Sequence, residues 1–169
     1  MAGISSAELS EIKEASIRLS EGAGGLPKRF FTGSIKPGAE PRIKVIRGFR
    51  GVGKTTALLQ LLGGKSVYFS MDSPYVQKHR LYELGRRFAL EGFNTLLVDE
   101  VLTYGAWKSE TKAIYDEFPA VSLVLSGSAP LAFEPERRFD ITDALPLSLR
   151  ELLHLKGERH LQSNDWPDS

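Results

Sequence analysis

The chain has 169 residues, of which 41% are hydrophobic and 25% charged. This composition fits one globular domain and excludes a disordered, collagen-like or coiled-coil chain. Lys and Arg number 22 against 21 for Asp and Glu, so the net charge of +1 does not argue for binding to nucleic acid or membranes. The absence of cysteine excludes disulfides, Cys-ligated zinc and a thiol nucleophile. No apolar run approaches the roughly 18 residues of a membrane span, and the N-terminus lacks the apolar run of a secretory signal. We therefore expect a cytoplasmic protein.

Residues 1–41 are expected to form a lead-in to the domain. Ser5 or Ser6 can cap a helix, because a short side-chain oxygen accepts from the free N–H groups of a first turn. Three apolar residues recur in this helix at near-helical spacing: Leu9, Ile12 and Leu19. Residues 21–41 are rich in Gly and Pro, which break regular structure, so we expect this stretch to wind over the surface.

From residue 42 onward, short apolar runs alternate with amphipathic stretches. The apolar runs predict strands at 43–46, 66–70, 95–98 and 121–125, and a weak last strand at 138–144. The amphipathic stretches predict helices at 54–62, 79–90, 107–118 and 148–155. Such alternation is typical of an α/β fold with an open, mostly parallel sheet and helices on both faces, a three-layer sandwich. The domain core is then 42–155, followed by a polar tail at 156–169.

A glycine-rich segment, GFRGVGKT from Gly48 to Thr55, fits the pattern G-x-x-x-x-G-K-[ST] between a predicted strand and helix. Glycines allow a close approach that a Cβ would forbid, and successive N–H groups at the start of a helix then point at a phosphate. Lys54 supplies a charge for the β- and γ-phosphate oxygens, and the Thr55 hydroxyl can hold Mg²⁺. The predicted phosphate-binding residues are Gly48, Arg50, Gly51, Val52, Gly53, Lys54, Thr55 and Thr56.

An acidic pair, Asp99 and Glu100, directly follows the predicted strand at 95–98. In a parallel sheet this places both carboxylates at the carboxyl edge, where open α/β folds bind their ligands. Asp99 would hold Mg²⁺ through water, and Glu100 would act as the general base that activates the attacking water. The adjacent Glu favours hydrolysis over phosphoryl transfer to a small acceptor. The three histidines have no metal-ligand spacing, so we expect no metal site beyond that of Mg²⁺.

These motifs together resemble those of the AAA-type P-loop ATPases of archaea and bacteria. The likeness covers residues 42–155 and begins with the loop. Trp107 keeps the family's spacing after the acidic pair, whereas Leu102 replaces its usual Gln. Other stretches are also similar to family motifs: VYFSMD at 67–72, LYEL at 81–84, SGS at 126–128 and PLSLRE at 146–151.

The resemblance implies the P-loop NTPase fold, with ATP and Mg²⁺ as cofactors and slow ATP hydrolysis as the activity. It also implies a polar residue after the fourth strand that senses the γ-phosphate, for which we favour Ser126 over Ser128. An arginine contact to the γ-phosphate would come from Arg137 or Arg138, supplied by self-association or by a partner domain. The expected catalytic residues are Lys54, Glu100, Ser126 and Arg138. Relatives continue into a helical lid, so we expect the lid and further C-terminal domains to be absent here.

Two other functions also fit the sequence. One is a nucleotide-gated module that binds DNA or protein, with incidental hydrolysis, because the recognising parts would lie in other domains. The other is a small P-loop kinase, which needs a lid with several arginines, whereas tandem arginines occur only at 86–87 and 137–138. Adenine is the expected base, because the resemblance implies it and the guanine-reading string N-K-x-D is absent.

Overall fold

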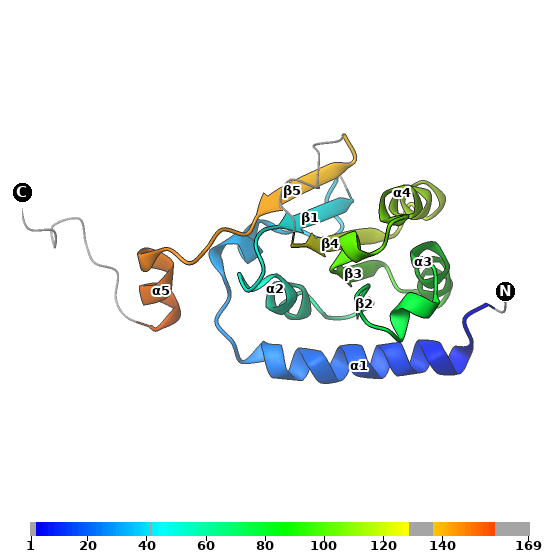
Figure 1. Cartoon of the computed structure of the whole chain (residues 1–169), viewed down its shortest axis with the longest axis horizontal. Helices are drawn as coiled ribbons and strands as arrows, with labels where there is room; N and C mark the ends of the chain where they lie inside the picture. Colours follow the sequence, from blue (N-terminus) through cyan, green and yellow to red (C-terminus); the bar gives the residue numbers. More distant parts are fainter. Residues whose placement is uncertain (1–2, 41, 129–136, 158–169) are drawn as a thin grey trace, which may run out of the picture.

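A five-stranded parallel sheet lies at the centre of the part of the chain that the computed structural model describes, which is residues 3–40, 42–128 and 137–157 (Figure 1). The strand order is β2-β3-β4-β1-β5, and every neighbouring pair runs parallel. The strands are β1 (Ile43–Arg47), β2 (Ser66–Ser70), β3 (Thr95–Asp99), β4 (Ser122–Gly127) and β5 (Phe139–Asp143). The predicted α/β class with a parallel sheet is confirmed.

Helices cover both faces of this sheet, which gives the predicted three layers (Figure 1). On one face lies α2 (Lys54–Gln60), and on the other lie α3 (Leu81–Leu90) and α4 (Trp107–Glu117). After β5 the chain forms α5 (Leu149–Leu155), which lies at one end of the molecule. Three short 3-10 turns complete the described elements: η1 (Phe30–Ser34), η2 (Val76–Lys78) and η3 (Val101–Thr103).

The sheet separates two apolar clusters because successive side chains of a strand point to opposite faces. In β3, Leu96 and Val98 pack in the larger cluster with α3 and α4, whereas Leu97 packs in the smaller cluster with α2. Trp107 is buried in the larger cluster, where its ring stacks on Phe139 with centroids 6.0 Å apart. Trp107 is therefore a core residue.

The first helix, α1 (Ser6–Gly24), runs along the edge strand β2 (Figure 1). Ser5 caps it in a capping box with Glu8, which selects one of the two expected caps. The hydroxyl of Ser16 accepts the backbone N–H of Tyr68 over 2.9 Å, so α1 satisfies a donor of the exposed sheet edge. Of the three apolar residues at near-helical spacing, Leu9 and Ile12 are buried, whereas Leu19 is 48% exposed.

The stretch from 21 to 41 packs more closely than the sequence predicts. Helix α1 continues to Gly24, and the chain then forms η1, in which Thr32 is buried. Ile35 is also buried and joins the apolar cluster beside α2. The lead-in is therefore part of the packed domain, although residue 41 lies outside the described residues.

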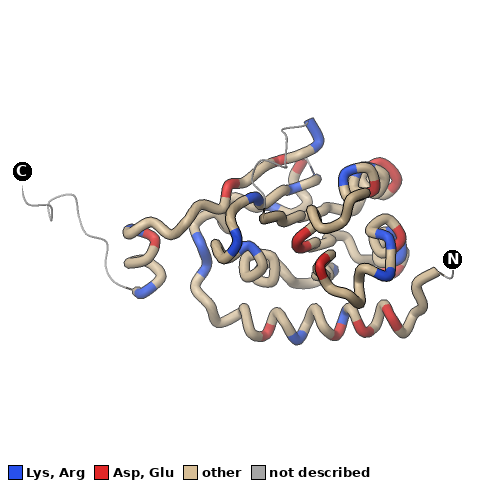
Figure 2. Tube along the Cα trace, viewed as in Figure 1, with Lys and Arg blue, Asp and Glu red and all other residues tan. Residues whose placement is uncertain are grey.

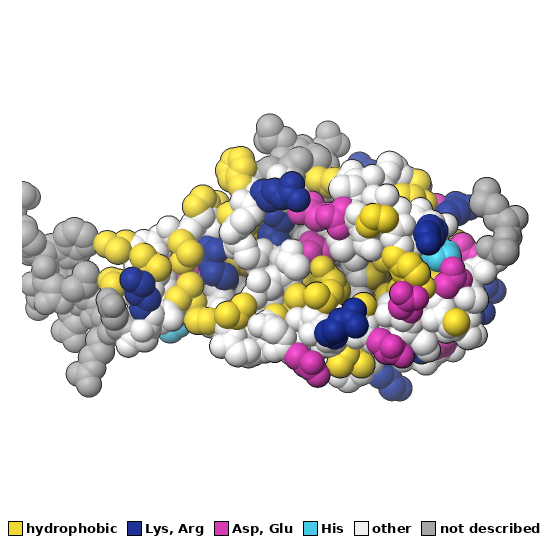
Figure 3. Space-filling view, turned by 60° about the horizontal axis from the view of Figure 1, so that its bottom comes forward, with side chains coloured by type: hydrophobic (Ala, Val, Ile, Leu, Met, Phe, Trp, Pro, Cys, Tyr) yellow, Lys and Arg dark blue, Asp and Glu magenta, His cyan; other side chains and the backbone are white. Residues whose placement is uncertain are grey.

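Charges of both signs are mixed along α1, α3, α4 and α5 (Figure 2). This mixture agrees with the near-neutral net charge, and it marks none of these helices as a single-sign binding surface. Hydrophobic side chains gather at the surface over α5 (Figure 3), where Leu149 and Leu152 are exposed. Among the described residues, no helix is both long and apolar enough to cross a membrane.

Candidate nucleotide site

The phosphate loop follows the carboxyl end of β1 and leads into the first turn of α2. Gly53 directly precedes α2 in a left-handed conformation, with φ of 92°, that side chains rarely adopt. A Cβ at Gly48 would lie 2.3 Å from the carbonyl oxygen of Ala144, so only glycine fits at the beginning of the loop. Both ends of the loop therefore need glycine for geometric reasons.

Lys54 is buried at the centre of this loop, with 5% of its surface exposed. Its Nζ donates to the carbonyl oxygens of Gly48 at 3.0 Å and Phe49 at 2.8 Å, and to Oγ of Ser128 at 3.1 Å. Burial lowers the pKa of Lys54, an effect that the nearby charge of Glu100 opposes. The ammonium is thus held by neutral acceptors, two in its own loop and one after β4.

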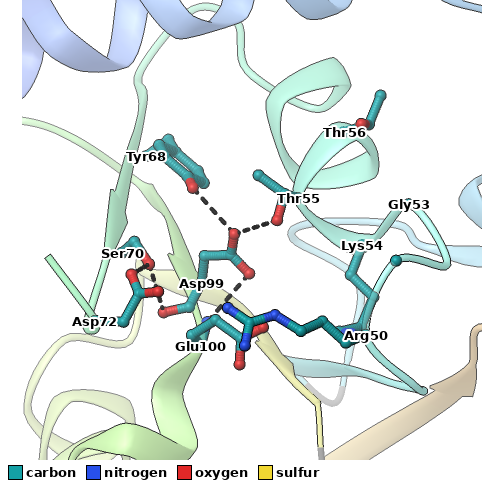
Figure 4. Close-up of a pocket in the computed structure, with 11 residues that line it drawn as sticks. Arg50, Gly53, Lys54, Thr55, Thr56, Tyr68, Ser70, Asp72, Asp99 and Glu100 are labelled. Carbon is teal, nitrogen blue, oxygen red and sulfur yellow. Dashed lines mark hydrogen bonds between the residues drawn. The ribbon is translucent and has the colours of Figure 1, made fainter.

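Asp99, at the end of β3, accepts hydrogen bonds on both carboxylate oxygens. Its Oδ2 accepts from Oγ1 of Thr55 at 2.6 Å and from the hydroxyl of Tyr68 at 3.0 Å (Figure 4). Its Oδ1 accepts from the hydroxyl of Ser126 and from the N–H of Glu100 at 3.1 Å. Burial and the charge of Asp99 raise the pKa of Tyr68, so the phenol stays protonated and donates. Four donors from different elements therefore fix the orientation of this carboxylate.

Glu100 adopts a strained backbone conformation directly after β3. With φ of 46°, it is the only residue other than glycine with a positive φ among those that the structure describes. Such a conformation costs on the order of 1–3 kcal/mol and occurs preferentially at functional sites. The hydroxyl of Ser128 donates to Oε1 of Glu100. Ser128 therefore connects Glu100 to Lys54, because it also accepts from the ammonium.

These groups line one cleft with a volume of about 450 Å³ (Figure 4). This volume lies within the range of roughly 300–1,000 Å³ that is typical of small-molecule sites. The cleft is lined by Arg50, Gly51, Gly53, Lys54, Thr55, Thr56, Tyr68, Ser70, Asp72, Asp99 and Glu100. Most of the predicted loop residues and both acidic residues therefore lie together, as expected for strand ends at one edge of a parallel sheet.

Two of the predicted loop residues lie outside the lining of this cleft. Val52 is mostly buried and packs in the apolar cluster beside α2. Gly48 offers its carbonyl oxygen to Lys54 and makes the close approach to Ala144. These two residues support the conformation of the loop, whereas the other six line the cleft.

Ser126 contacts both members of the acidic pair. It is fully buried in β4, where its hydroxyl donates to Asp99 and accepts from the N–H of Glu100 at 3.2 Å. Ser128, one residue past the end of β4, instead contacts both Lys54 and Glu100. Ser126 therefore contacts Asp99 and Glu100, whereas Ser128 contacts Lys54 and Glu100; the sensor role expected for Ser126 stays a prediction.

Arg138 does not belong to the phosphate site of its own chain. It directly precedes β5, whose first residue, Phe139, pairs with Ile43 at the amino end of β1. The phosphate loop lies beyond the opposite end of β1, about 17 Å away for a five-residue strand. The guanidinium of Arg138 is half-exposed and lies 3.5 Å from the carboxylate of Asp116. Arg138 is therefore separated from the phosphate loop of its own chain by about the length of β1.

Five residues near the loop were not predicted. Tyr68, Ser70 and Asp72 come from β2 and the turn after it, and Ser70 donates to Asp72 over 2.6 Å. The acidic turn after the second strand was visible in the sequence, but nothing there assigned it to the cleft. Arg29 and Glu151 join the loop from the lead-in and from α5. Glu151 ends the PLSLRE motif at 146–151, but that motif did not connect it to the loop, and no local pattern marks Arg29.

The oxygens of Thr55 and Asp99 fit a magnesium ion as ligands. Mg²⁺ is usually bound by one or two protein oxygens together with water and phosphate oxygens. Groups of three or more His, Asp or Glu side chains suited to a metal do not occur within the described residues. A metal at this edge would therefore depend on a phosphate ligand, as it does in nucleotide sites.

Comparisons with known proteins agree with this arrangement. A protein family described as AAA domain matches residues 40–153. Among curated proteins, none matches the chain. Among solved structures, the chain is similar to PCH-2 of C. elegans, with a TM-score of 0.50 and 14% identity over 97% of this chain. It is also similar to Trip13 of Rhizobiales, with a TM-score of 0.42 and 15% identity over 81% of this chain.

The identity to PCH-2 is low, so this likeness shows the fold alone. The chain spans about half of the PCH-2 structure, 52%, and 64% of the Trip13 structure.

Proposed function

This chain belongs to the AAA domain family, and from this premise we propose that it binds ATP with Mg²⁺ and hydrolyses it slowly to ADP and phosphate. One observation carries the proposal. Thr55 and Asp99, whose side chains lie 2.6 Å apart, line one cleft together with Lys54 and Glu100, which Ser128 joins through its hydroxyl. At the carboxyl edge of the sheet, the cleft would thus combine groups for phosphate binding, for metal binding and for general-base catalysis.

Phosphate binding would begin with the loop and the start of α2. N–H groups of the loop and the positive end of the helix dipole favour an anion there. The Lys54 ammonium now donates to two backbone carbonyls, and phosphate oxygens would replace these neutral acceptors with charged ones. Arg50 lines the same cleft and adds a second positive charge.

Asp99 and Thr55 would hold the magnesium ion. When bound, Mg²⁺ neutralises part of the phosphate charge and so stabilises the transition state for transfer of the γ-phosphoryl group. Tyr68 and Ser126 keep the Asp99 carboxylate oriented through their hydrogen bonds. The protein thereby supplies a metal ligand whose direction is fixed before the ion arrives.

Glu100 would act as the general base. Its carboxylate lines the cleft and accepts a hydrogen bond from Ser128, which limits where the side chain can point. From this position it would take a proton from the water that attacks the γ-phosphorus. Turnover would be slow, because the chain's own Arg138 lies at the opposite sheet edge and an arginine at the γ-phosphate accelerates such reactions strongly.

The finer parts of the proposal rest on the resemblance to archaeal and bacterial AAA-type ATPases. They are the preference for adenine, release of ADP, action in the cytoplasm, and self-association or a partner domain that supplies an arginine. Binding to nucleic acid belongs to the alternative function, in which nucleotide controls the attachment of DNA or protein and hydrolysis is incidental.

A thermal-shift assay of the full chain tests the binding site. We expect ATP with Mg²⁺ to raise the melting temperature, because a ligand that binds only the folded state stabilises it. Lys54→Ala should remove most of this shift, whereas the exposed control Lys65→Ala should keep it. Equal shifts in the wild type and Lys54→Ala would contradict the assignment of the loop.

Phosphate release then separates the functions. The proposed ATPase should release phosphate from ATP without an added acceptor. Binding without turnover, together with nucleotide-dependent attachment to DNA or protein, would support the alternative module. A phosphorylated small acceptor among the products would instead indicate a kinase.

A further inference from the structure

Arg29, in the segment between α1 and η1, joins three parts of the chain that are far apart in sequence. Its Nε and Nη2 donate to the two carboxylate oxygens of Glu151 in α5, at 2.7 and 3.0 Å. Its Nη1 donates to the carbonyl oxygen of Val52 in the phosphate loop. Its Nη2 also donates to the carbonyl oxygen of Leu145, after β5, at 2.8 Å. A single guanidinium therefore connects the loop to α5.

This connection is buried, unlike an ordinary surface ion pair. The side chains of Arg29 and Glu151 are only 11% and 8% exposed. The backbone N–H of Phe30 also donates to Oε1 of Glu151, at 2.8 Å, so the carboxylate has several partners. A buried pair of this kind is costly to break from one side, because the remaining charge is left without its partner.

The Arg29–Glu151 pair helps to attach helix α5 to the domain. Glu151 is the only buried residue of the helix, whereas Leu149 and Leu152 are exposed. Figure 3 shows hydrophobic side chains at the surface over this part of the molecule. The Arg29–Glu151 pair and a ring contact between Phe30 and His154, whose centroids lie 5.1 Å apart, therefore both attach α5 to the domain.

The Arg29 contact also fixes one peptide group of the phosphate loop. A trans peptide group is planar, and its C=O and N–H point in opposite directions. Because the carbonyl of Val52 points to Arg29, the N–H of the same peptide group, which belongs to Gly53, points away from Arg29. Gly53 itself lines the cleft. Arg29 thus orients a donor that a bound phosphate would use.

We propose that Arg29 is a positioning residue for the phosphate loop, and that Glu151 of α5 holds it in place, so that phosphate affinity depends on α5 being docked. This inference rests on the proposed nucleotide function. Coupling between two sites is reciprocal, so nucleotide in the cleft should in turn strengthen the docking of α5. A protein or domain that displaces α5 would then promote nucleotide release.

The test compares the wild type with Arg29→Met, Arg29→Lys and Glu151→Gln. A matched control is Asp143→Asn, which alters an exposed ion pair of similar length, 2.6 Å, between Asp143 of β5 and Arg47 of β1. Calorimetric titration with ADP should give a dissociation constant weakened roughly tenfold to a hundredfold in Arg29→Met. Glu151→Gln should weaken binding less, in the same direction, and Asp143→Asn should not change it.

A second measurement separates positioning from a general loss of structure. In the nucleotide-free protein, the NMR amide resonance of Gly53 should shift in the Arg29 and Glu151 variants and stay in place in Asp143→Asn. Hydrogen exchange of the α5 amides should slow when ADP is added to the wild type. If Arg29→Met does not fold, Arg29→Lys provides the same comparison, because its ammonium cannot reach Glu151 and Val52 together.

The outcomes distinguish the two proposals. If the wild type binds ADP and the folded Arg29 variants bind it equally well, the coupling is wrong and the nucleotide function stands. If the wild type does not bind nucleotide, the proposed function fails, and the Gly53 resonance still decides whether Arg29 orients the loop. An unchanged Gly53 resonance in every variant would overturn the positioning role.

Discussion

The hydroxyl of Thr55 donates to Oδ2 of Asp99 over 2.6 Å, which joins the first turn of α2 to the carboxyl end of β3. The two residues are 44 positions apart in the chain. Both are oxygen ligands of the kind that Mg²⁺ prefers. In the metal-free arrangement each satisfies the other, so a metal that binds both must replace this hydrogen bond. Metal binding should therefore respond strongly to changes at Asp99.

Asp99→Asn should weaken the response to Mg²⁺ more than the response to nucleotide alone. The amide keeps the size of the carboxylate but loses its charge. Its NH₂ group also replaces one of the two oxygens that accept from the four surrounding donors. We expect the Mg²⁺ concentration for half-maximal thermal stabilisation by ATP to rise by at least about tenfold. Melting temperatures with ATP in EDTA and with ATP over a Mg²⁺ series provide the measurement.

The matched control for this substitution is Asp72→Asn. Asp72 lines the same cleft, but its carboxylate contacts Ser70 rather than Thr55. It should leave the Mg²⁺ dependence close to that of the wild type. If Asp99→Asn lowers both responses in proportion, Asp99 has only a structural role.

Glu100→Gln should retain nucleotide binding and lose turnover. Glutamine keeps the oxygen that accepts from Ser128 but cannot take a proton from water at neutral pH. Removal of a general base typically lowers the rate by about 10²–10⁴-fold. Phosphate release and ADP affinity should be measured on the same preparation, with the exposed Glu91→Gln as the control. Hydrolysis that continues at the wild-type rate would exclude Glu100 from the mechanism.

The sequence predicts the loop and the acidic pair well because both are local patterns. A glycine loop between a strand and a helix, and an apolar strand that runs into Asp99 and Glu100, need only neighbours in sequence to be recognised. Parallel strands then bring the two motifs to one edge of the sheet. The position of Arg138 at the opposite edge follows from the same rule, since it stands at the start of a predicted strand.

Other parts of the site depend on contacts between distant residues. Tyr68 reaches Asp99 across 31 positions, and Arg29 reaches Glu151 across 122. No periodicity or motif records such contacts. Ser126 and Ser128 are alike in type and two positions apart, so the sequence does not show how far β4 extends. The structure ends β4 at residue 127, which buries the first serine and leaves the second beside Lys54.

The pH dependence of stability should report the Arg29–Glu151 pair. The hydrogen bond from Arg29 holds the pKa of Glu151 below its ordinary value of 4.5. A carboxylate with a lowered folded-state pKa contributes stability above the unfolded pKa and loses it as pH falls toward the folded value. At pH 7 the free energy of unfolding of the wild type should therefore exceed that of Glu151→Gln by about 1–3 kcal/mol. This difference should shrink below about pH 4.5.

Denaturant unfolding of the two proteins between pH 7 and pH 3 measures this difference. Arg47 likewise lowers the pKa of Asp143, but the Asp143 side chain is 53% exposed. Exposed pairs contribute only about 0–1 kcal/mol, so Asp143→Asn should change stability little at any pH. A difference for Glu151→Gln that stays constant down to pH 3 would show that its carboxylate does not contribute through its charge.

The last prediction concerns Arg138 and assembly. Its guanidinium is 45% exposed, with contacts to Asp116 at 3.5 Å and to the Tyr115 ring at 5.8 Å from the centroid, so a neighbouring subunit could engage it. An arginine supplied to the γ-phosphate in this way can raise the rate by about 10³–10⁵-fold. The isolated chain should therefore be a poor ATPase, largely monomeric at micromolar concentration, with specific activity that rises steeply as the chain is concentrated.

Arg138→Ala should flatten this rise without changing ADP affinity. The control Arg18→Ala, on the exposed side of α1, should leave the rise unchanged. Sedimentation and turnover over one concentration series decide the matter, because activity that is high and independent of concentration would exclude an arginine supplied between subunits.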